Sequence, residues 1–261
     1  MKNCNEKSKN DAATQWLPVF LTFIFYFLTW NMHIAGLQRT TLVDYPGKVA
    51  ATVFTRGCSF SCPFCHNPEL VLPAKFIPLL DEKEIWAFFD KRRHQLQGVC
   101  ITGGEPTIQS DLPLFVAKLK SFGYKIKLDT NGSNPAMLGR LIDSGHIDYI
   151  AMDIKASPSK YLATAGVKNP SVSTRPSLDG NIKNQNDNSK LLNNIKQSIG
   201  LIMESGIDYE FRTTVVHPIH EVSDFEEIGK LIRGAKKYYL QNFVQSKHID
   251  ESQKFTPMTD K

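Results

Sequence analysis

The chain has 261 residues, of which 41% are hydrophobic and 22% are charged. This length and composition exclude a disordered chain and allow one sizeable α/β domain. The formal net charge of +5 at pH 7 comes from Lys and Arg residues scattered among Asp and Glu. Without an arginine-rich run or a basic aromatic platform, nucleic-acid binding is not expected.

The first 31 residues form an apolar extension whose central run, WLPVFLTFIFYFLTW, spans residues 16–30. This run is shorter than the ~20 residues that a membrane-spanning helix needs, and it contains Pro18. Three lysines precede it, as in a signal peptide, but no small-residue cleavage pattern follows. We therefore expect neither export nor a membrane span. The segment is either a membrane-associating extension or the product of a start codon assigned upstream of Met32.

From residue 49 onward, short β-branched or aromatic runs alternate with amphipathic stretches. The predicted strands are VAATVFT, GVCIT, YKIKLDT, YIAMDI and YEFRTTVV. The predicted helices lie at residues 81–93, 111–122, 135–144, 191–205 and 224–237. Repeated strand–helix units of this kind predict an α/β fold with parallel strands. Five or six such units predict a partial (β/α)6-type TIM barrel.

Two segments lack an apolar period. Residues 167–190 are rich in Asn, Ser, Lys, Asp and Pro, which predicts an exposed loop inserted into the domain. Residues 251–261 are a polar tail. The main domain is therefore expected over residues 32–250.

Three cysteines, Cys58, Cys62 and Cys65, lie close together in RGCSFSCPFCHNP, directly after the first predicted strand. Such short separations favour a shared metal site over disulfides and indicate a reducing, cytoplasmic setting. Three thiolates are one ligand short of a closed zinc site, which His66 could complete. On a 4Fe-4S cluster they would leave one iron open to an outside ligand. Both kinds of site are consistent with the spacing.

Three later strands also end in polar motifs, TGGEP at 102–106, DTNG at 129–132 and DIK at 153–155. Because parallel strands present their carboxyl ends at one mouth, these motifs are expected to meet there with the cysteine loop. Two glycines allow a backbone to approach a ligand closely, although GGEP and DTNG are each ordinary turn sequences alone. Arg212 faces either this cavity or solvent. His217, His220 and Cys100 are interpreted as loop or core residues without a catalytic role.

The C-x3-C-x2-C loop, with Phe64 before its last cysteine, resembles the signature of the radical S-adenosylmethionine (SAM) superfamily. The resemblance implies that Cys58, Cys62 and Cys65 bind a 4Fe-4S cluster. It also implies that SAM chelates the open iron through its amino and carboxylate groups. One-electron cleavage of SAM would then yield a deoxyadenosyl radical.

The same resemblance implies further contacts with SAM. Phe64 would pack near the adenine, and Glu105 would contact the methionyl amino group. Lys155 would pair with the SAM carboxylate, and Asp129 and Asp153 would act through a bound monovalent cation. The expected cofactor-binding residues are Phe64, Asn67, Gly103, Gly104, Glu105, Asp129, Thr130, Asn131, Asp153, Lys155 and Arg212.

Longer segments, among them SGHIDYIAMDIKA and ESGIDYEFRTTVV, resemble the activating proteins of anaerobic ribonucleoside-triphosphate reductase. The resemblance covers residues 32–250 and implies hydrogen-atom abstraction from a glycine of that glycyl-radical reductase. It also implies a flavodoxin- or ferredoxin-type electron donor. The sequence departs from these relatives in its apolar extension, its polar insertion and an expected shortening of the C-terminal end.

Two alternatives remain open. The first is a radical SAM enzyme that acts on another glycyl-radical enzyme or on a small molecule, since no motif marks the target. The second belongs to another class and is a zinc-binding interaction module without turnover.

Overall fold

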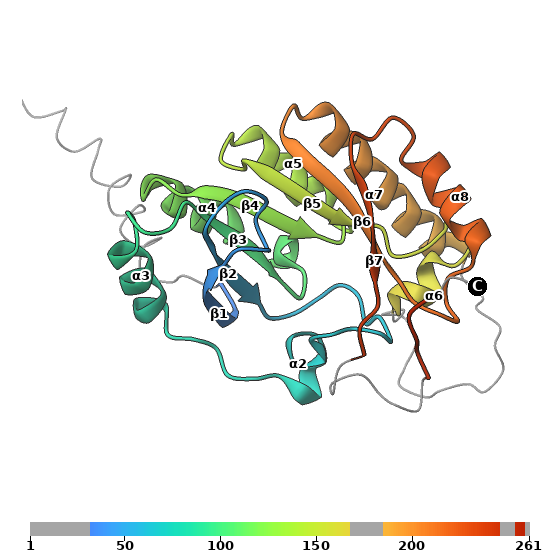
Figure 1. Ribbon diagram of the computed structural model, residues 1–261, viewed down its shortest axis with the longest axis horizontal. Helices are drawn as coiled ribbons and strands as arrows, with labels where there is room; N and C mark the ends of the chain where they lie inside the picture. The colour runs from blue at the N-terminus through green and yellow to red at the C-terminus, as the bar shows by residue number, and fades with distance from the viewer. Residues whose placement is uncertain (1–31, 168–184, 246–253, 259–261) are drawn as a thin grey trace, which may run out of the picture.

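The computed structural model describes residues 32–167, 185–245 and 254–258. Its centre is a seven-stranded sheet in which every strand neighbours the next one along the chain (Figure 1). The strands are β1 (Ile34–Thr41), β2 (Ala50–Thr55), β3 (Gly98–Gly103), β4 (Lys125–Thr130), β5 (Tyr149–Asp153), β6 (Asp208–Val215) and β7 (Tyr238–Asn242). Strands β2 to β7 run parallel. The predicted parallel α/β fold is therefore confirmed.

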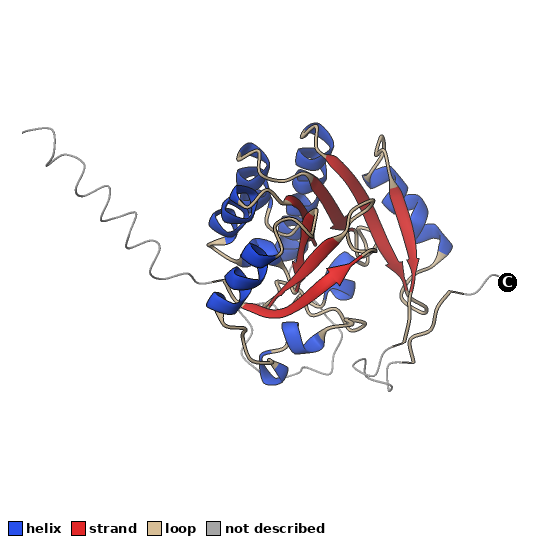
Figure 2. Ribbon diagram, turned by 60° about the vertical axis from the view of Figure 1, so that its left-hand side comes forward, coloured by secondary structure: helices blue, strands red, loops and turns tan. Residues whose placement is uncertain are grey.

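From β2 onward, helices lie between successive strands and flank the sheet (Figure 2). The longer ones are α3 (Glu82–Lys91), α4 (Leu112–Ser121), α5 (Pro135–Asp143), α7 (Gln185–Glu204) and α8 (Val222–Leu231). The short ones are α2 (Pro68–Val71), α6 (Tyr161–Ala165) and the 3-10 helices η1 (Pro73–Lys75) and η2 (Pro106–Ile108). No helix within these described stretches is long and apolar enough to cross a membrane.

The structure differs from the expected elements at both edges of the sheet. Strand β1 was not predicted, and it pairs antiparallel with β2. Helix α8 ends at Leu231, six residues before the predicted end at 237. Gly234 has a φ of +91°, a left-handed conformation that a helix cannot continue through. The residues that follow form the edge strand β7.

Helix α7 begins at Gln185 and so includes the last part of the segment predicted as a loop over 167–190. Residues 168–184 of that segment, the apolar extension over 1–31 and most of the predicted tail lie outside the described residues. The domain limits at 32 and 250 stay a prediction.

The two faces of the sheet differ in chemistry, as β4 illustrates. Ile126 and Leu128 are fully buried in the apolar core that also includes Phe115 of α4. Burying each such side chain contributes about 1.5–3 kcal/mol to folding. Because side chains alternate along a strand, Lys127 and Asp129 point to the opposite, inner face. This inner face holds the polar site described below.

Candidate active site

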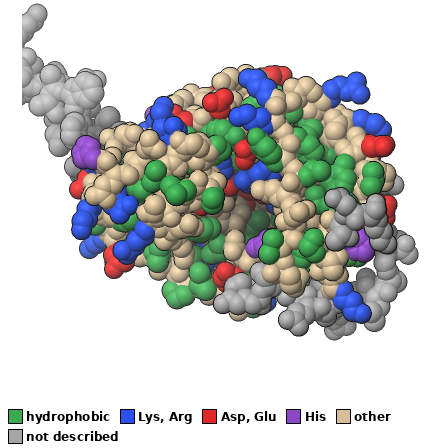
Figure 3. All heavy atoms as spheres, viewed as in Figure 1, with side chains coloured by type: hydrophobic (Ala, Val, Ile, Leu, Met, Phe, Trp, Pro, Cys, Tyr) green, Lys and Arg blue, Asp and Glu red, His purple; other side chains and the backbone are tan. Residues whose placement is uncertain are grey.

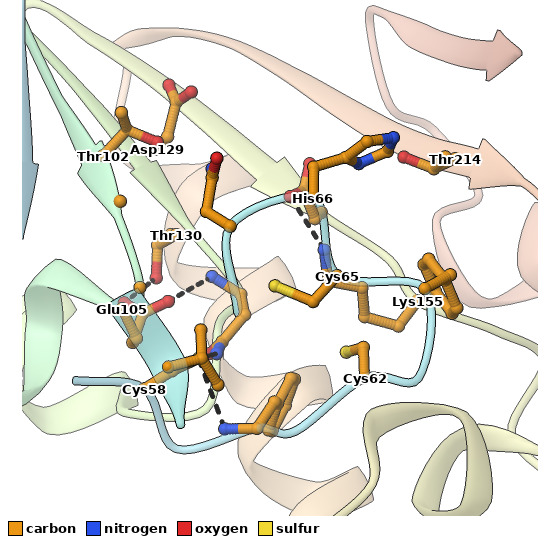
Figure 4. Close-up of a pocket in the computed structure, with 18 residues that line it drawn as sticks. Cys58, Cys62, Cys65, His66, Thr102, Glu105, Asp129, Thr130, Lys155 and Thr214 are labelled. Carbon is orange, nitrogen blue, oxygen red and sulfur yellow. Dashed lines mark hydrogen bonds and ion pairs between the residues drawn. The ribbon is translucent and has the colours of Figure 1, made fainter. Parts of the chain in front are cut away.

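The cysteine loop follows β2 and borders a cavity of about 210 Å³. The thiols of Cys58, Cys62 and Cys65 are partly buried, form no disulfide and line this cavity. Figure 4 shows the loop in the middle of the site, with Glu105 and Thr130 on one side and Lys155 on the other. A strand end thus delivers three thiols to one mouth, as the sequence predicts.

Backbone hydrogen bonds hold the loop at both ends. The amide of Gly57 donates to the carbonyl of Leu70 in α2, at 2.7 Å. The amide of Ser61 donates to the carbonyl of Ala165 at the end of α6, at 2.9 Å. The chain turns at Gly166, whose φ is +60° and whose missing Cβ would lie 2.2 Å from the Ser61 oxygen. The loop is therefore shaped by elements on both sides of it.

Gly103 and Gly104, at the end of β3, also pack closely against the chain beside the cysteine loop. A Cβ on Gly104 would lie 1.9 Å from the carbonyl oxygen of Gly57, and one on Gly103 would lie 2.3 Å from the amide of Thr55. The glycines were expected to admit a ligand. In the structure, the backbone that approaches them is the chain's own, from the end of β2 to Gly57. They join β3 to the cysteine loop.

Glu105 is buried and joins two of the polar strand ends. Its Oε1 accepts from the Thr130 hydroxyl at 2.7 Å and from the Thr107 amide at 3.1 Å. Its Oε2 accepts from the amide of Asn131 at 2.6 Å. Burial raises the pKa of Glu105, and these hydrogen bonds only partly offset the effect.

Ion pairs connect the next two strand ends. Arg212 Nε lies 2.9 Å from Asp153 Oδ1, and Arg212 Nη2 lies 3.2 Å from Asp129 Oδ2. Lys155 Nζ lies 3.0 Å from Asp153 Oδ2. Arg212 therefore faces inward on β6, which excludes the solvent-facing alternative.

The charges of this group change the proton affinities of its members. Burial alone would raise the pKa of Asp153, but Arg212 and Lys155 outweigh it and hold the pKa well below its usual range. Burial alone would lower the pKa of Lys155, but Asp153 outweighs it and raises the pKa. Both groups are therefore charged at neutral pH.

The three thiols of the cysteine loop, by contrast, favour their uncharged form. Burial raises the pKa of Cys58 to about 12 and that of Cys62 to about 11, and it also raises the pKa of Cys65. The metal-free thiols thus keep their protons at neutral pH. Iron ligation would replace those protons, because the thiolate is the ligand form.

The structure brings the predicted site residues together. The cavity is lined by Cys58, Cys62, Phe64, Cys65, Asn67, Gly103, Gly104, Glu105, Asp129, Thr130, Asn131, Asp153 and Lys155. Arg212 is not in the lining but contacts two residues that are. Phe60, Val71, Thr102 and Thr214 also line the cavity and were not predicted. Thr102 and Thr214 lie near the carboxyl ends of β3 and β6, so strand-end position was the available signal.

His66 and His220 have structural partners. His66, considered as a fourth zinc ligand, has Nε2 2.9 Å from the carbonyl oxygen of Val244. Across the described ranges, no three His, Cys, Asp or Glu side chains are arranged to hold one metal ion. The buried ring of His220 accepts from the Val216 amide through Nδ1 at 3.0 Å, and its Nε2 lies 2.9 Å from the carbonyl oxygen of Lys155.

A sequence profile described as the radical SAM superfamily matches residues 52–232, from β2 to the end of α8. The chain belongs to the radical SAM superfamily. It is a radical SAM enzyme, and family membership implies a 4Fe-4S cluster and SAM as cofactors. The alternative of a zinc module without turnover is therefore wrong.

Two relatives refine this assignment. A Methanocaldococcus jannaschii protein named as a glycyl-radical enzyme activating enzyme is 30% identical over 226 residues, covering 86% of this chain and 85% of that protein. The pyruvate formate-lyase-activating enzyme of Clostridium pasteurianum is 30% identical over 126 residues, covering 47% of this chain and 52% of the relative. The chain is thus related to glycyl-radical enzyme activating enzymes.

Solved structures agree on the fold. The structure of Streptococcus suis SuiB bound to its precursor peptide SuiA matches with a TM-score of 0.53 and 12% identity. The match covers 94% of this chain and 48% of SuiB. At this identity the likeness concerns the radical SAM fold alone.

The residues present fit the implied cluster. The donors are three unpaired thiols on one ordered loop, all facing one cavity. A cube of iron and sulfide is larger than a single ion, so its thiolates need not converge on one point. The polar strand ends across the cavity offer charged partners for a zwitterionic ligand such as SAM.

Proposed function

We propose that this radical SAM enzyme generates a glycyl radical on anaerobic ribonucleoside-triphosphate reductase. One observation carries the proposal: the three cysteines and the polar ends of β3, β4 and β5 line one cavity. The relatives named as activating enzymes support the class of target. The reductase itself is supported by the sequence segments that resemble its activating proteins.

The cofactors would supply the bond-breaking chemistry. With both bound, the cluster and SAM would supply one-electron reductive cleavage of the sulfonium bond and a radical able to take a hydrogen atom from a glycine Cα. The chain's part is to bind, orient and shield. Cys58, Cys62 and Cys65 would hold the cluster, and Lys155 would pair with the carboxylate of SAM.

The remaining residues would fix the orientation of SAM. Phe64 is buried with Val216 and Phe243 and offers an apolar wall for the adenine. Glu105 would receive the methionyl amino group, in keeping with its position in the lining and its already fixed orientation. Holding the reacting parts in one geometry is how a protein accelerates a step that its cofactors perform.

The open face of the molecule suits a macromolecular substrate. Strands β1 and β7 are the two ends of the described sheet order and do not pair with each other. Acidic and basic side chains gather around a hollow near the centre of the face seen in Figure 3. A loop of a partner protein would reach the cavity through such an opening.

A second target is favoured by a specific finding. One relative is the pyruvate formate-lyase-activating enzyme of C. pasteurianum, so another glycyl-radical enzyme is the alternative substrate. The electron donor in either case would be a flavodoxin or ferredoxin in a reducing, cytoplasmic setting.

The test begins with anaerobic reconstitution of the iron–sulfur cluster in the full chain. The protein is incubated with dithionite, SAM and the purified reductase, and in parallel with pyruvate formate-lyase. We expect deoxyadenosine in both mixtures and a glycyl-radical electron paramagnetic resonance signal only with the reductase. A signal only with pyruvate formate-lyase would transfer the proposal to that enzyme. Deoxyadenosine without either radical would indicate a different substrate.

A further inference from the structure

Lys127 is a lysine buried on the inner face of the central strand β4. Its side chain is 2% exposed and forms an ion pair with Asp129 Oδ1. Its Nζ also lies 3.8 Å from Cys100 Sγ and 6.0 Å from the centre of the Tyr149 ring. Because an ammonium loses its hydration when buried, it is stable there only with an anionic partner. Asp129, which lines the SAM cavity, is that partner.

Both carboxylate oxygens of Asp129, and both of Asp153, contact the chain's own cations. Asp129 Oδ1 contacts Lys127, and Asp129 Oδ2 contacts Arg212 Nη2 at 3.2 Å. Asp153 Oδ1 accepts from Arg212 Nε at 2.9 Å, and Asp153 Oδ2 accepts from Lys155 Nζ at 3.0 Å. Neither aspartate has a carboxylate oxygen without a cationic neighbour.

The group is also balanced in charge. A third carboxylate, Glu210, has Oε1 3.8 Å from Arg212 Nη1, and its Oε2 accepts from the Tyr149 hydroxyl at 2.7 Å. The three cations Lys127, Lys155 and Arg212 therefore face the three anions Asp129, Asp153 and Glu210. Within this group of ion pairs, a further cation would find no oxygen of Asp129 or Asp153 that lacks a cation of the chain.

We propose that Lys127 is the built-in cation of the SAM carboxylate site and acts in place of the bound monovalent cation that the family resemblance implies. The inference rests on the proposed SAM site. Lys127 is a positioning residue that acts through a series of ion pairs. It pairs with Asp129, Asp129 pairs with Arg212, and Arg212 pairs with Asp153. Asp153 in turn holds Lys155 at the cavity. A cation fixed to the backbone keeps this chain of ion pairs in place whatever salt surrounds the protein.

The experiment measures SAM binding by the reconstituted full chain in potassium, sodium and tetramethylammonium chloride at equal ionic strength. The wild-type Kd is expected to stay within about twofold across the three salts. Lys127→Met keeps the apolar stem and removes the charge. Its Kd is expected to rise about tenfold in tetramethylammonium and to recover in sodium or potassium, which are small enough to occupy the vacated place.

Two further variants separate positioning from general stability. Lys127→Arg retains a cation and is expected to bind SAM independently of salt. Lys125→Met removes a charge two residues away on the same strand, where the lysine side chain is 55% exposed and paired with Asp148. It is expected to behave as the wild type. The unfolding temperature of cluster-free protein in the three salts gives a second readout, with specific stabilisation by sodium or potassium expected only for Lys127→Met.

The results of these SAM-binding measurements distinguish failure of the inference from failure of the proposed function. Wild-type SAM binding that is lost in tetramethylammonium would overturn the inference, and so would a Lys127→Met variant that binds SAM normally there. If Lys127→Met does not fold, the wild-type salt series and Lys127→Arg still decide. A wild-type protein with a full cluster that binds no SAM in any salt would instead contradict the proposed function.

Discussion

Cys62 and Cys100 are cysteines on neighbouring parts of the fold with different surroundings. Cys62 lines the cavity with the other two cysteines of its loop. Cys100 is fully buried on β3, and its Sγ lies 3.6 Å from Asp129 Oδ1. We therefore expect position in the cavity, and not residue type alone, to separate a cluster ligand from a core thiol.

Replacing Cys62 by Ser should remove one of the three iron–sulfur ligands. After anaerobic reconstitution we expect most of the iron and the brown colour of the wild type to be lost. Cys100→Ala is the matched control and should retain both. Iron and sulfide analysis with visible absorption measures the difference. Full iron content in Cys62→Ser would contradict the assignment of this residue as a ligand.

Asp153 should make the stability of the protein fall in acid. Its pKa is held below the usual range by Arg212 and Lys155, so its contribution is present above the unfolded-state pKa of about 3.9 and is lost as pH falls towards the folded-state pKa. Asp153→Asn is expected to lower the free energy of unfolding by about 2 kcal/mol at neutral pH. The difference from the wild type should shrink in acid.

Urea unfolding at several pH values down to about pH 3 would measure this change. Asp143→Asn, an exposed position at the end of α5, is the control. A constant difference between Asp153→Asn and the wild type at every pH would mean that the ion pairs do not set the pKa of Asp153.

At the scale of elements, the close packing between the end of β3 and the cysteine loop can be tested by adding a single Cβ atom. Gly104→Ala would put a Cβ 1.9 Å from the Gly57 carbonyl oxygen, so backbone must shift. We expect a loss of about 1–3 kcal/mol in the free energy of unfolding, together with reduced iron binding. Chemical denaturation and iron analysis measure the two effects.

Gly200→Ala is the control because Gly200 lies in helix α7, where an added Cβ would meet nothing within 4 Å. It should stabilise the protein by about 0.5–1 kcal/mol, since alanine favours a helix over glycine. Equal effects of the two substitutions would show that the contact between Gly104 and the loop is not close in solution.

The predictable elements are those with a regular pattern and a buried face. Strands β2 to β6 are apolar runs between amphipathic stretches, and their polar carboxyl ends identified most of the site. Strand β7 was missed because four of its five residues are exposed, so no apolar run marks it. Strand β1 was missed because five of its eight residues are only partly buried or exposed and it contains Gly36.

Lys127 was missed for a different reason. Alternation along KIKLDT places it on the same side as Asp129, but a lysine in a strand normally indicates a solvated face. Its burial depends on Asp129 from its own strand and Cys100 from β3, which only the register of the sheet brings together. Non-local pairing of this kind leaves no signal in a single sequence.

At the scale of the whole molecule, the described fold begins close to Met32. Met32 packs in the core, and β1 starts at Ile34. A chain that begins at Met32 is therefore expected to match the full chain in unfolding temperature and in iron content after reconstitution.

Fractionation of cells expressing either chain tests the role of residues 1–31. We expect both chains in the soluble fraction, because the apolar run over 16–30 is shorter than the ~20 residues that span a membrane. Recovery of the full chain with the membranes, and of the shorter chain without them, would identify the extension as an anchor.

The hydrogen bonds that hold the cysteine loop have a consequence for how the protein responds to loss of its cluster. Small zinc domains fold only when metal arrives, so chelation unfolds them. Here, Leu70 and Ala165 fix the loop through backbone contacts that involve no thiol. Loss of the cluster and loss of the fold are therefore expected to be separate events. We expect cluster-free protein to stay folded and to take up iron and sulfide again without refolding.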